Sequence, residues 1–313
     1  MNDELTSAER DLIEQLPGPP ESAEISATNV WIVEWLPAAE KQTGWMLHVW
    51  MKQRREGLSA YFSCQSKKEV IAALAKAIAL SQRSALRPIL HLEAHGDENG
   101  LEGPNGSGDA EALTWDELTS PLQDLNLATR CNLVVVVAAC TGFAGIKALS
   151  RGPRAPAVAL VGPSAPLTPS DLLLGAKEFY RRLLDAKPSL AKMAESASRE
   201  VGTVSFAWEP FAIIAYEALI ENLVRSVRPA KRLSRNNRLR QRLLRETELP
   251  VSEVDARLAT LSSILPWETL QQTWDEMFMI DVEPSNRERF GLDFRAIVTH
   301  IDAHSTEYGV ADA

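Results

Sequence analysis

Two apolar runs, residues 89–96 and 134–142, constrain the fold of this 313-residue chain more than any other feature. Each has the length of a strand and leads to a reactive side chain, His95 in the first run and Cys140 in the second. A glycine follows directly or one residue later. Near-continuous apolar runs are typical of strands buried on both faces of a parallel sheet. Because ligands bind beyond the carboxyl ends of such strands, we expect the imidazole and the thiol at one sheet edge.

Strand-like and helix-like segments alternate around these two runs. Ser66 and Thr114 each open a Ser/Thr-x-x-Glu pattern, the signature of a helix capping box, and each begins a predicted helix. Residues 157–161 have strand character and precede a helix expected over 170–184. This alternation predicts an α/β fold with a mostly parallel sheet flanked by helices. Because a single helix separates the two apolar runs, we expect their strands to be neighbours.

Further segments complete the predicted sheet and its rim. Residues 29–36 and 45–51 are predicted to be two strands joined by a polar turn at 40–44, and 58–64 is a third short strand. The glycine-rich segment 100–108 lacks the Gly-Lys-Ser/Thr element of a phosphate loop. We therefore expect this segment to form a flexible rim to the site.

The carboxyl-terminal third differs in pattern from the sheet region. Beyond about residue 210 the apolar spacing is mostly helical, and 204–208 is a last strand candidate. We therefore expect a sheet domain over residues 28–210 and a helical region over 211–313. Residues 1–27, before the sheet domain, are expected to form an N-terminal helix and linker.

The composition favours a reduced, cytoplasmic setting. The chain starts without a basic and apolar leader, no run reaches the roughly 18 apolar residues of a membrane span, and three cysteines are an odd number. The net charge of −9 argues against nucleic acid as the main partner. One segment, 225–245, opposes this charge with nine Lys/Arg and no acidic residue. One interpretation of this segment is a docking face for an acidic partner, for nucleic acid or for a membrane surface. The alternatives are an exposed linker and a solvated face that pairs with the chain's own acidic side chains.

The residues at the two strand ends fit nucleophilic catalysis. A thiolate at Cys140 is a competent nucleophile, and His95 can protonate a leaving amine. The backbone N–H groups of Gly96 and Cys140 are the candidate oxyanion donors. Glu93 shares a side of its strand with His95 and is a candidate to orient it. Taken singly, a cysteine after four valines is commonly a core residue and a strand-end histidine a structural one. Together the two residues favour a catalytic pair.

The segments Leu92-Glu-Ala-His95-Gly96 and Val137-Ala-Ala-Cys140, with one helix between them, resemble the caspase-like (clan CD) cysteine peptidases, in particular their bacterial CHAT branch. The resemblance covers roughly residues 28–187 and includes Val161-Gly162 and Phe179-Tyr180. It implies a caspase-like fold and endopeptidase activity through a thioester acyl-enzyme, with no metal or organic cofactor. It also implies a protein substrate, for example an effector activated by cleavage in bacterial anti-phage defence.

One departure from that family concerns cleavage specificity. Caspases have a glutamine two residues before the cysteine, and it helps to form the pocket for an aspartate; this chain has Ala138 there. Specificity for aspartate is therefore in doubt. Asp97 and Asp171, with Glu98 and Glu209, are candidates to pair with a basic side chain instead. Asp171 follows a threonine by three residues and is alternatively a helix cap, so the primary specificity stays open.

Other classes of function stay open on the sequence. The chain is alternatively a non-catalytic interaction protein that keeps the caspase-like fold and docks through the basic segment 225–245, or a small-molecule cysteine hydrolase. His300 and His304 have the spacing of zinc ligands on one helix face, but they lack the glutamate of a metallopeptidase motif and are expected to be structural or exposed. Cys64 and Cys131 are expected to be structural.

Overall fold

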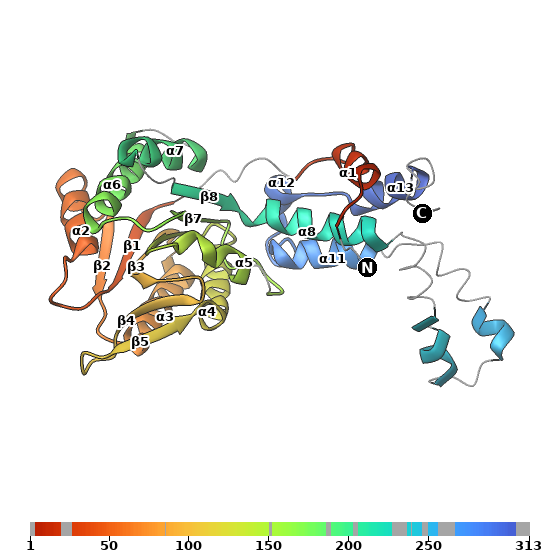
Figure 1. Ribbon diagram of the computed structural model, residues 1–313, viewed down its shortest axis with the longest axis horizontal. Helices are drawn as coiled ribbons and strands as arrows, with labels where there is room; N and C mark the ends of the chain where they lie inside the picture. Colours follow the sequence, from red (N-terminus) through yellow and green to blue (C-terminus); the bar gives the residue numbers. More distant parts are fainter. Residues whose placement is uncertain are drawn as a thin grey trace. The chain divides into compact units, whose positions relative to one another are not determined.

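The computed structural model describes residues 4–19, 27–84, 86–149, 152–185, 189–202, 206–226, 237–238, 240–245, 250–255 and 267–304. The chain divides into two compact units. One unit comprises residues 22–214 and 277–289 and contains the sheet, and the other comprises 1–21, 215–276 and 290–313 (Figure 1).

The sheet is mostly parallel, as predicted. Its main strands are β1 (Asn29–Trp35), β2 (Ser59–Ser63), β3 (Pro88–Gly96), β6 (Val134–Ala138), β7 (Ala159–Pro163) and β8 (Phe206–Pro210). Their order is β2-β1-β3-β6-β7-β8, and β8 alone of these runs antiparallel to its neighbour. The two apolar runs are adjacent, since β3 and β6 pair from Ile89 with Val134 to Glu93 with Ala138. The predicted α/β class is therefore confirmed.

Helices cover both faces of this sheet (Figure 1). The flanking helices are α2 (Thr43–Arg54), α6 (Pro169–Asp185) and α7 (Leu190–Val201) on one face, and α3 (Lys67–Ser84) and α4 (Trp115–Ala128) on the other. On the first face Ile89 and Val136 from the strands pack in one buried cluster with Leu47 of α2 and Phe179 of α6. Alternate residues of each strand share a face, so Glu93 and His95 lie on the same face as Ile89.

The segment 45–51, predicted to be a strand, lies instead within helix α2, so that prediction is wrong. Leu47 and Met51, four residues apart, are fully buried, whereas Trp45 is 48% exposed. The physical reason is the parallel pairing of β1 with β2. Parallel neighbours need a crossover connection, so the chain between them must leave the sheet and return.

The glycine-rich segment 100–108 is also more ordered than predicted, because most of it belongs to a hairpin. Strands β4 (Gly100–Pro104) and β5 (Ala110–Thr114) pair antiparallel, and β4 pairs with the end of β3 at His95 and Gly96. The hairpin is fixed to the sheet where β1 ends, since Trp35 Nε1 donates to Pro104 O at 2.8 Å. The rim of the site is thus a β-hairpin.

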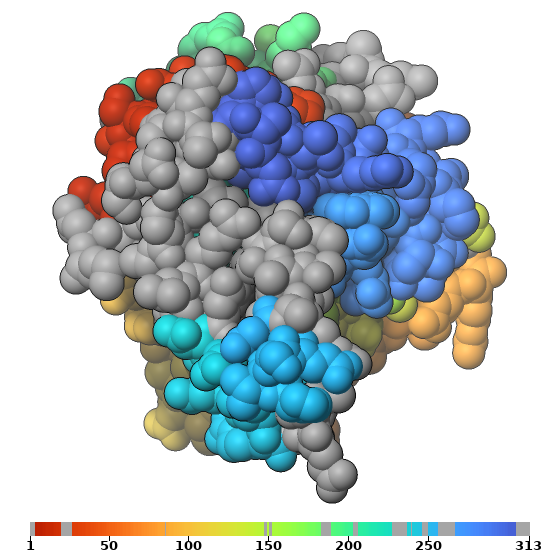
Figure 2. Space-filling view, turned by 90° about the vertical axis from the view of Figure 1, so that its right-hand side faces the viewer, coloured from red at the N-terminus to blue at the C-terminus, as the bar shows by residue number. Residues whose placement is uncertain are grey.

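The second unit is helical in the part that the structure describes. It contains α1 (Ser7–Glu14), most of α8 (Phe211–Ser226), α11 (Trp267–Met277) and α13 (Phe294–His304), and Figure 2 shows the surface of its carboxyl-terminal helices in blue. Its core centres on Trp274, whose indole N–H donates to Phe290 O at 2.6 Å and whose ring lies 5.8 Å from that of Phe294. The short helices η2 (Pro284–Asn286) and α12 (Arg287–Phe290) fall largely in the stretch that belongs to the sheet unit. None of the described helices has both the length and the apolar character needed to cross a membrane.

Most of the basic segment 225–245 lies outside the described residues. At its start Arg225 forms an ion pair with Glu221 at 2.8 Å, one helical turn away. Near its end Arg240 pairs with Asp255 at 2.7 Å. These two arginines therefore contact acidic side chains of the same chain.

Candidate active site

His95 and Cys140 come from neighbouring parallel strands and reach the same edge of the sheet. Glu93 and Ala138 are register partners, His95 lies two residues beyond the first and Cys140 two residues beyond the second. His95 still belongs to β3, and Cys140 lies in the turn just beyond β6, so both residues lie at the carboxyl edge of the sheet. Both residues line a single cavity of ≈ 70 Å³ at this edge. The structure thus brings the predicted pair together.

A sharp turn follows Cys140. Thr141 has a left-handed backbone with φ 53°, and Gly142 N donates to Ala139 O at 3.0 Å. A Cβ at position 142 would lie 2.7 Å from Val137 O, so only glycine fits this close return. The chain then continues as the 3-10 helix η1 (Gly142–Ala144) and α5 (Gly145–Leu149). The turn leaves Cys140 as a partly exposed free thiol at the strand end.

The backbone of Gly96 is directed toward the β6 side of β3. Gly96 and Leu101 are antiparallel partners, and Asp97 N donates to Gly100 O at 3.0 Å, so the N–H of Asp97 faces β4. Successive N–H groups of a strand point to opposite edges, which turns the N–H of Gly96 toward β6. The β3–β6 ladder ends before this point, at Glu93 and Ala138. A Cβ on Gly96 would lie 2.9 Å from Gly100 O, so this approach also requires glycine.

The partner of His95 is Glu40, which the sequence interpretation missed. His95 Nε2 donates to Glu40 Oε2 at 2.9 Å, and both side chains are nearly half exposed. The loop that carries Glu40 is fixed locally, because Gln42 Nε2 donates to Glu40 O and to Pro37 O. One signal was available in the sequence: a polar loop directly after the strand 29–36 must lie at the same sheet edge as His95.

Glu93, expected to orient His95, belongs instead to a buried network, so that expectation is corrected. Its carboxylate accepts from His91 Nε2 at 2.8 Å and from the Thr43 hydroxyl. His91 Nδ1 lies 3.1 Å from Tyr180 Oη on α6. Residues 91, 93 and 95 share one face of the strand. Glu93 and His91 are both buried, and a buried carboxylate needs hydrogen bonds, so Glu93 binds His91 and not the more exposed His95.

A second buried carboxylate, Glu34, lies beside Glu93 on the neighbouring strand. It accepts from Gly44 N at 2.6 Å and from the Tyr61 hydroxyl. Burial raises the pKa of Glu34, and the neighbouring Glu93 raises it further. Thr43 and Gly44 are the first residues of α2, so the two carboxylates together bind the N-terminal turn of that helix.

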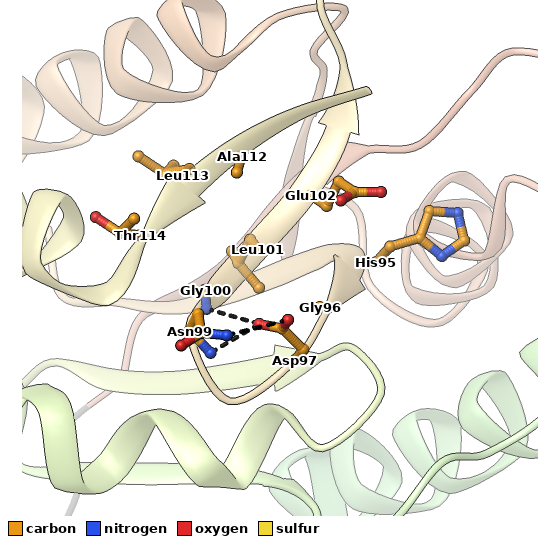
Figure 3. Close-up of a pocket in the computed structure, with 10 residues that line it drawn as sticks. All are labelled: His95, Gly96, Asp97, Asn99, Gly100, Leu101, Glu102, Ala112, Leu113 and Thr114. Carbon is orange, nitrogen blue, oxygen red and sulfur yellow. Dashed lines mark hydrogen bonds between the residues drawn. The ribbon is translucent and has the colours of Figure 1, made fainter. Parts of the chain in front are cut away.

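The three candidate specificity residues lie in three different settings. Ala138 lines the cavity shared by His95 and Cys140. Asp97 lines a separate groove of ≈ 390 Å³ along the hairpin, where its carboxylate accepts from Asn99 N and Gly100 N (Figure 3). The Asn99 N–H lowers the pKa of Asp97.

Asp171 takes part in the cap of α6. Its backbone N donates to Thr168 Oγ1 at 3.2 Å, and the Thr168 hydroxyl donates to its carboxylate at 2.7 Å. This is the capping role that the sequence offered as the alternative to substrate binding.

The remaining cysteines and the histidine pair lie in other environments. Cys64 and Cys131 are buried free thiols, and burial raises the pKa of each to about 12. His304 Nδ1 lies 2.9 Å from His300 O, so this ring contacts its own helix backbone. Within the described ranges no group of three or more His, Cys, Asp or Glu side chains is placed to hold a metal ion.

No protein-family model matches the chain, and no curated protein matches it. Among solved structures the chain is similar to the complex of Porphyromonas gingivalis RgpB pro- and mature domains, with a TM-score of 0.33 and 14% sequence identity. The match covers 61% of this chain and 51% of that chain, so this chain spans about half the length of the structure it matches.

Proposed function

We propose that the chain is a cysteine endopeptidase with Cys140 as nucleophile and His95 as general acid and base. One observation carries this proposal: the two side chains come from the carboxyl ends of adjacent parallel strands and line one cavity. A nucleophile and a proton-transfer group that share a cavity at a sheet edge are the arrangement that covalent acyl transfer needs.

The reaction follows from the groups at this edge. The Cys140 thiolate attacks the substrate carbonyl carbon, and the negative charge moves to the carbonyl oxygen, which the N–H groups of Gly96 and Cys140 stabilise. His95 gives a proton to the leaving amine as the C–N bond breaks, which leaves a thioester on Cys140. Water, deprotonated by His95, then attacks the thioester, and the acid product and the free thiol are released.

In this proposal Glu40 is a positioning residue. It binds Nε2 of His95, so Nδ1 is the ring nitrogen that exchanges protons with Cys140 and the leaving amine. A carboxylate on the outer nitrogen also stabilises the imidazolium that forms during the reaction. Glu40 therefore takes the role first assigned to Glu93.

The family resemblance supplies the setting of the proposal. It points to a protein substrate, such as an effector activated by cleavage in anti-phage defence, and to action in the cytoplasm. Neither step of the chemistry described above calls on a metal or an organic cofactor.

The test is hydrolysis of a fluorogenic peptide library by the full chain and three variants. We expect Cys140→Ala and His95→Ala to abolish turnover, while Cys64→Ala, a matched change at a buried thiol, keeps it. Turnover of simple esters without turnover of any peptide would favour a small-molecule hydrolase. Equal peptide turnover in wild type and Cys140→Ala would contradict the proposal.

A further inference from the structure

The cavity beside Cys140 has walls that are mostly apolar. Its lining includes Leu36, Ala138, Leu167 and Leu172, contributed by the end of β1, the end of β6, the loop after β7 and helix α6. Apolar walls with a few polar groups are typical of a pocket that binds an uncharged group by burial.

The charged groups at this cavity are already engaged by other parts of the chain. Glu93 is 3% exposed, and its two carboxylate oxygens accept from His91 and Thr43. Glu40 binds His95, and Lys41 Nζ donates to Ser170 Oγ at 2.8 Å on the exposed rim. A charged substrate side chain would therefore enter an apolar space without a dedicated partner, which is costly.

The size of the cavity favours a small group. Its volume of ≈ 70 Å³ is about half that of an apolar protein cavity of about 150 Å³ that binds benzene. An aromatic ring therefore needs more space than the cavity offers, and a shorter aliphatic side chain fits it better. Ala138 helps to set the volume of the cavity. It is the register partner of Glu93 and has only a methyl group, so a larger side chain at this position would extend into the cavity.

We propose that this cavity binds the substrate residue on the amino side of the cleaved bond, and that it selects a short, uncharged aliphatic side chain such as leucine. The inference rests on the proposed peptidase function, because it is Cys140 that makes the cavity a subsite. An aspartate is disfavoured by Glu93 and Glu40, since like charges repel. A lysine or arginine is disfavoured by its length and by the occupied oxygens of Glu93.

Peptidyl acyloxymethyl ketones of one sequence, differing only in the residue next to the reactive ketone, test this inference. The rate of Cys140 modification is measured by intact-protein mass spectrometry for probes with alanine, leucine, phenylalanine, aspartate or arginine at that position. Each rate is divided by the rate with iodoacetamide for the same protein, so that thiol reactivity cancels. We expect the leucine probe to react at least tenfold faster than the aspartate and arginine probes, in line with hydrophobic pocket discrimination.

Two variants of opposite effect separate the pocket from general damage to the fold. Ala138→Leu fills the cavity, so we expect the advantage of leucine over alanine to disappear. Leu172→Ala enlarges it, so the phenylalanine probe should gain at least tenfold relative to leucine. A gain of reactivity does not arise from misfolding, which makes this second variant the stronger control.

Different results identify which proposal fails. Preference for arginine, with loss of that preference in Glu93→Gln, would overturn the aliphatic pocket while leaving the peptidase proposal in place. Preference for aspartate would do the same. Alkylation of Cys140 by iodoacetamide with no reaction of any peptidyl probe would overturn the peptidase proposal and the pocket with it.

Discussion

Two glutamates lie near His95, and they differ in burial and in hydrogen-bond partner. On its own strand Glu93 is buried and bound to His91, while Glu40 from the loop after β1 is nearly half exposed and bound to His95. An exposed ion pair contributes little to stability, about 0–1 kcal/mol. In the proposed mechanism the role of Glu40 is therefore to fix the ring of His95.

Glu40→Gln tests this role at the level of one residue. The amide can still accept a hydrogen bond from His95 but carries no charge, so kcat/KM should fall about tenfold, with the loss in kcat rather than in KM, because Glu40 contacts the proton-transfer group and not the substrate. Melting temperature serves as the control and should stay within about 2 °C of wild type. A rise in KM with an unchanged kcat would show that Glu40 does not act through His95.

The sequence predicted where His95 and Cys140 lie, because each follows an apolar run and the two runs form adjacent parallel strands. Their catalytic role stays a prediction. Glu40 was missed because it lies in a loop, where no hydrophobic periodicity shows which way a side chain points.

Some helices are capped by residues of their own sequence and others by residues distant along the chain. Helix α4 was predicted from a capping box at Thr114, and the structure shows that box complete: Thr114 Oγ1 accepts from Glu117 N, and Glu117 accepts from Thr114 N. Helix α2 has no such cap from its own sequence, and two distant carboxylates, Glu34 and Glu93, bind its first turn instead. A helix whose first turn is capped by residues distant in the sequence has no local capping signal. The segment 45–51 was therefore predicted to be a strand.

The capping box of α4 predicts a pH dependence of stability. The side chains of Lys67 and Thr114 donate to Glu117 and hold its pKa at about 2, below its ordinary value of 4.5. A lowered folded-state pKa means that the stabilisation is present above pH 4.5 and is lost as the pH falls toward 2.

Glu117→Gln keeps the cap but removes the titrating group. The difference in urea midpoint between wild type and this variant should therefore be largest above pH 5 and should shrink as the pH falls below 4.5. A difference that stays constant from pH 6 to pH 2 would show that the ionised form of Glu117 does not stabilise α4.

In the whole molecule, the fold leaves one of the three cysteines accessible to solvent. Cys64 and Cys131 lie in the buried interior of the sheet unit, and burial raises the pKa of each to about 12. Cys140 alone of the three is partly exposed, at the sheet edge where His95 ends β3. Only thiolates react readily with electrophiles, so the fold itself protects the two structural cysteines.

The architecture of the sheet unit was largely predictable because its strands are long apolar runs with helices between them. The β4–β5 hairpin was not predicted, since its glycines resemble a loop and its strands form by pairing with the end of β3 and by contact with Trp35. In the same way, the assignment of residues 277–289 to the sheet unit depends on long-range contacts such as Ala155 N to Met277 O. Pairings between distant segments leave no periodic pattern in the sequence.

Peptide mapping of the full chain after reaction with a leucine-containing peptidyl acyloxymethyl ketone tests whether Cys140 and His95 act as a catalytic pair. We expect one adduct, at Cys140, with its rate of formation reduced about a hundredfold in His95→Ala because the base that activates the thiol is gone. An adduct at Cys64 or Cys131, or equal rates of Cys140 modification in wild type and His95→Ala, would rule out this catalytic pair.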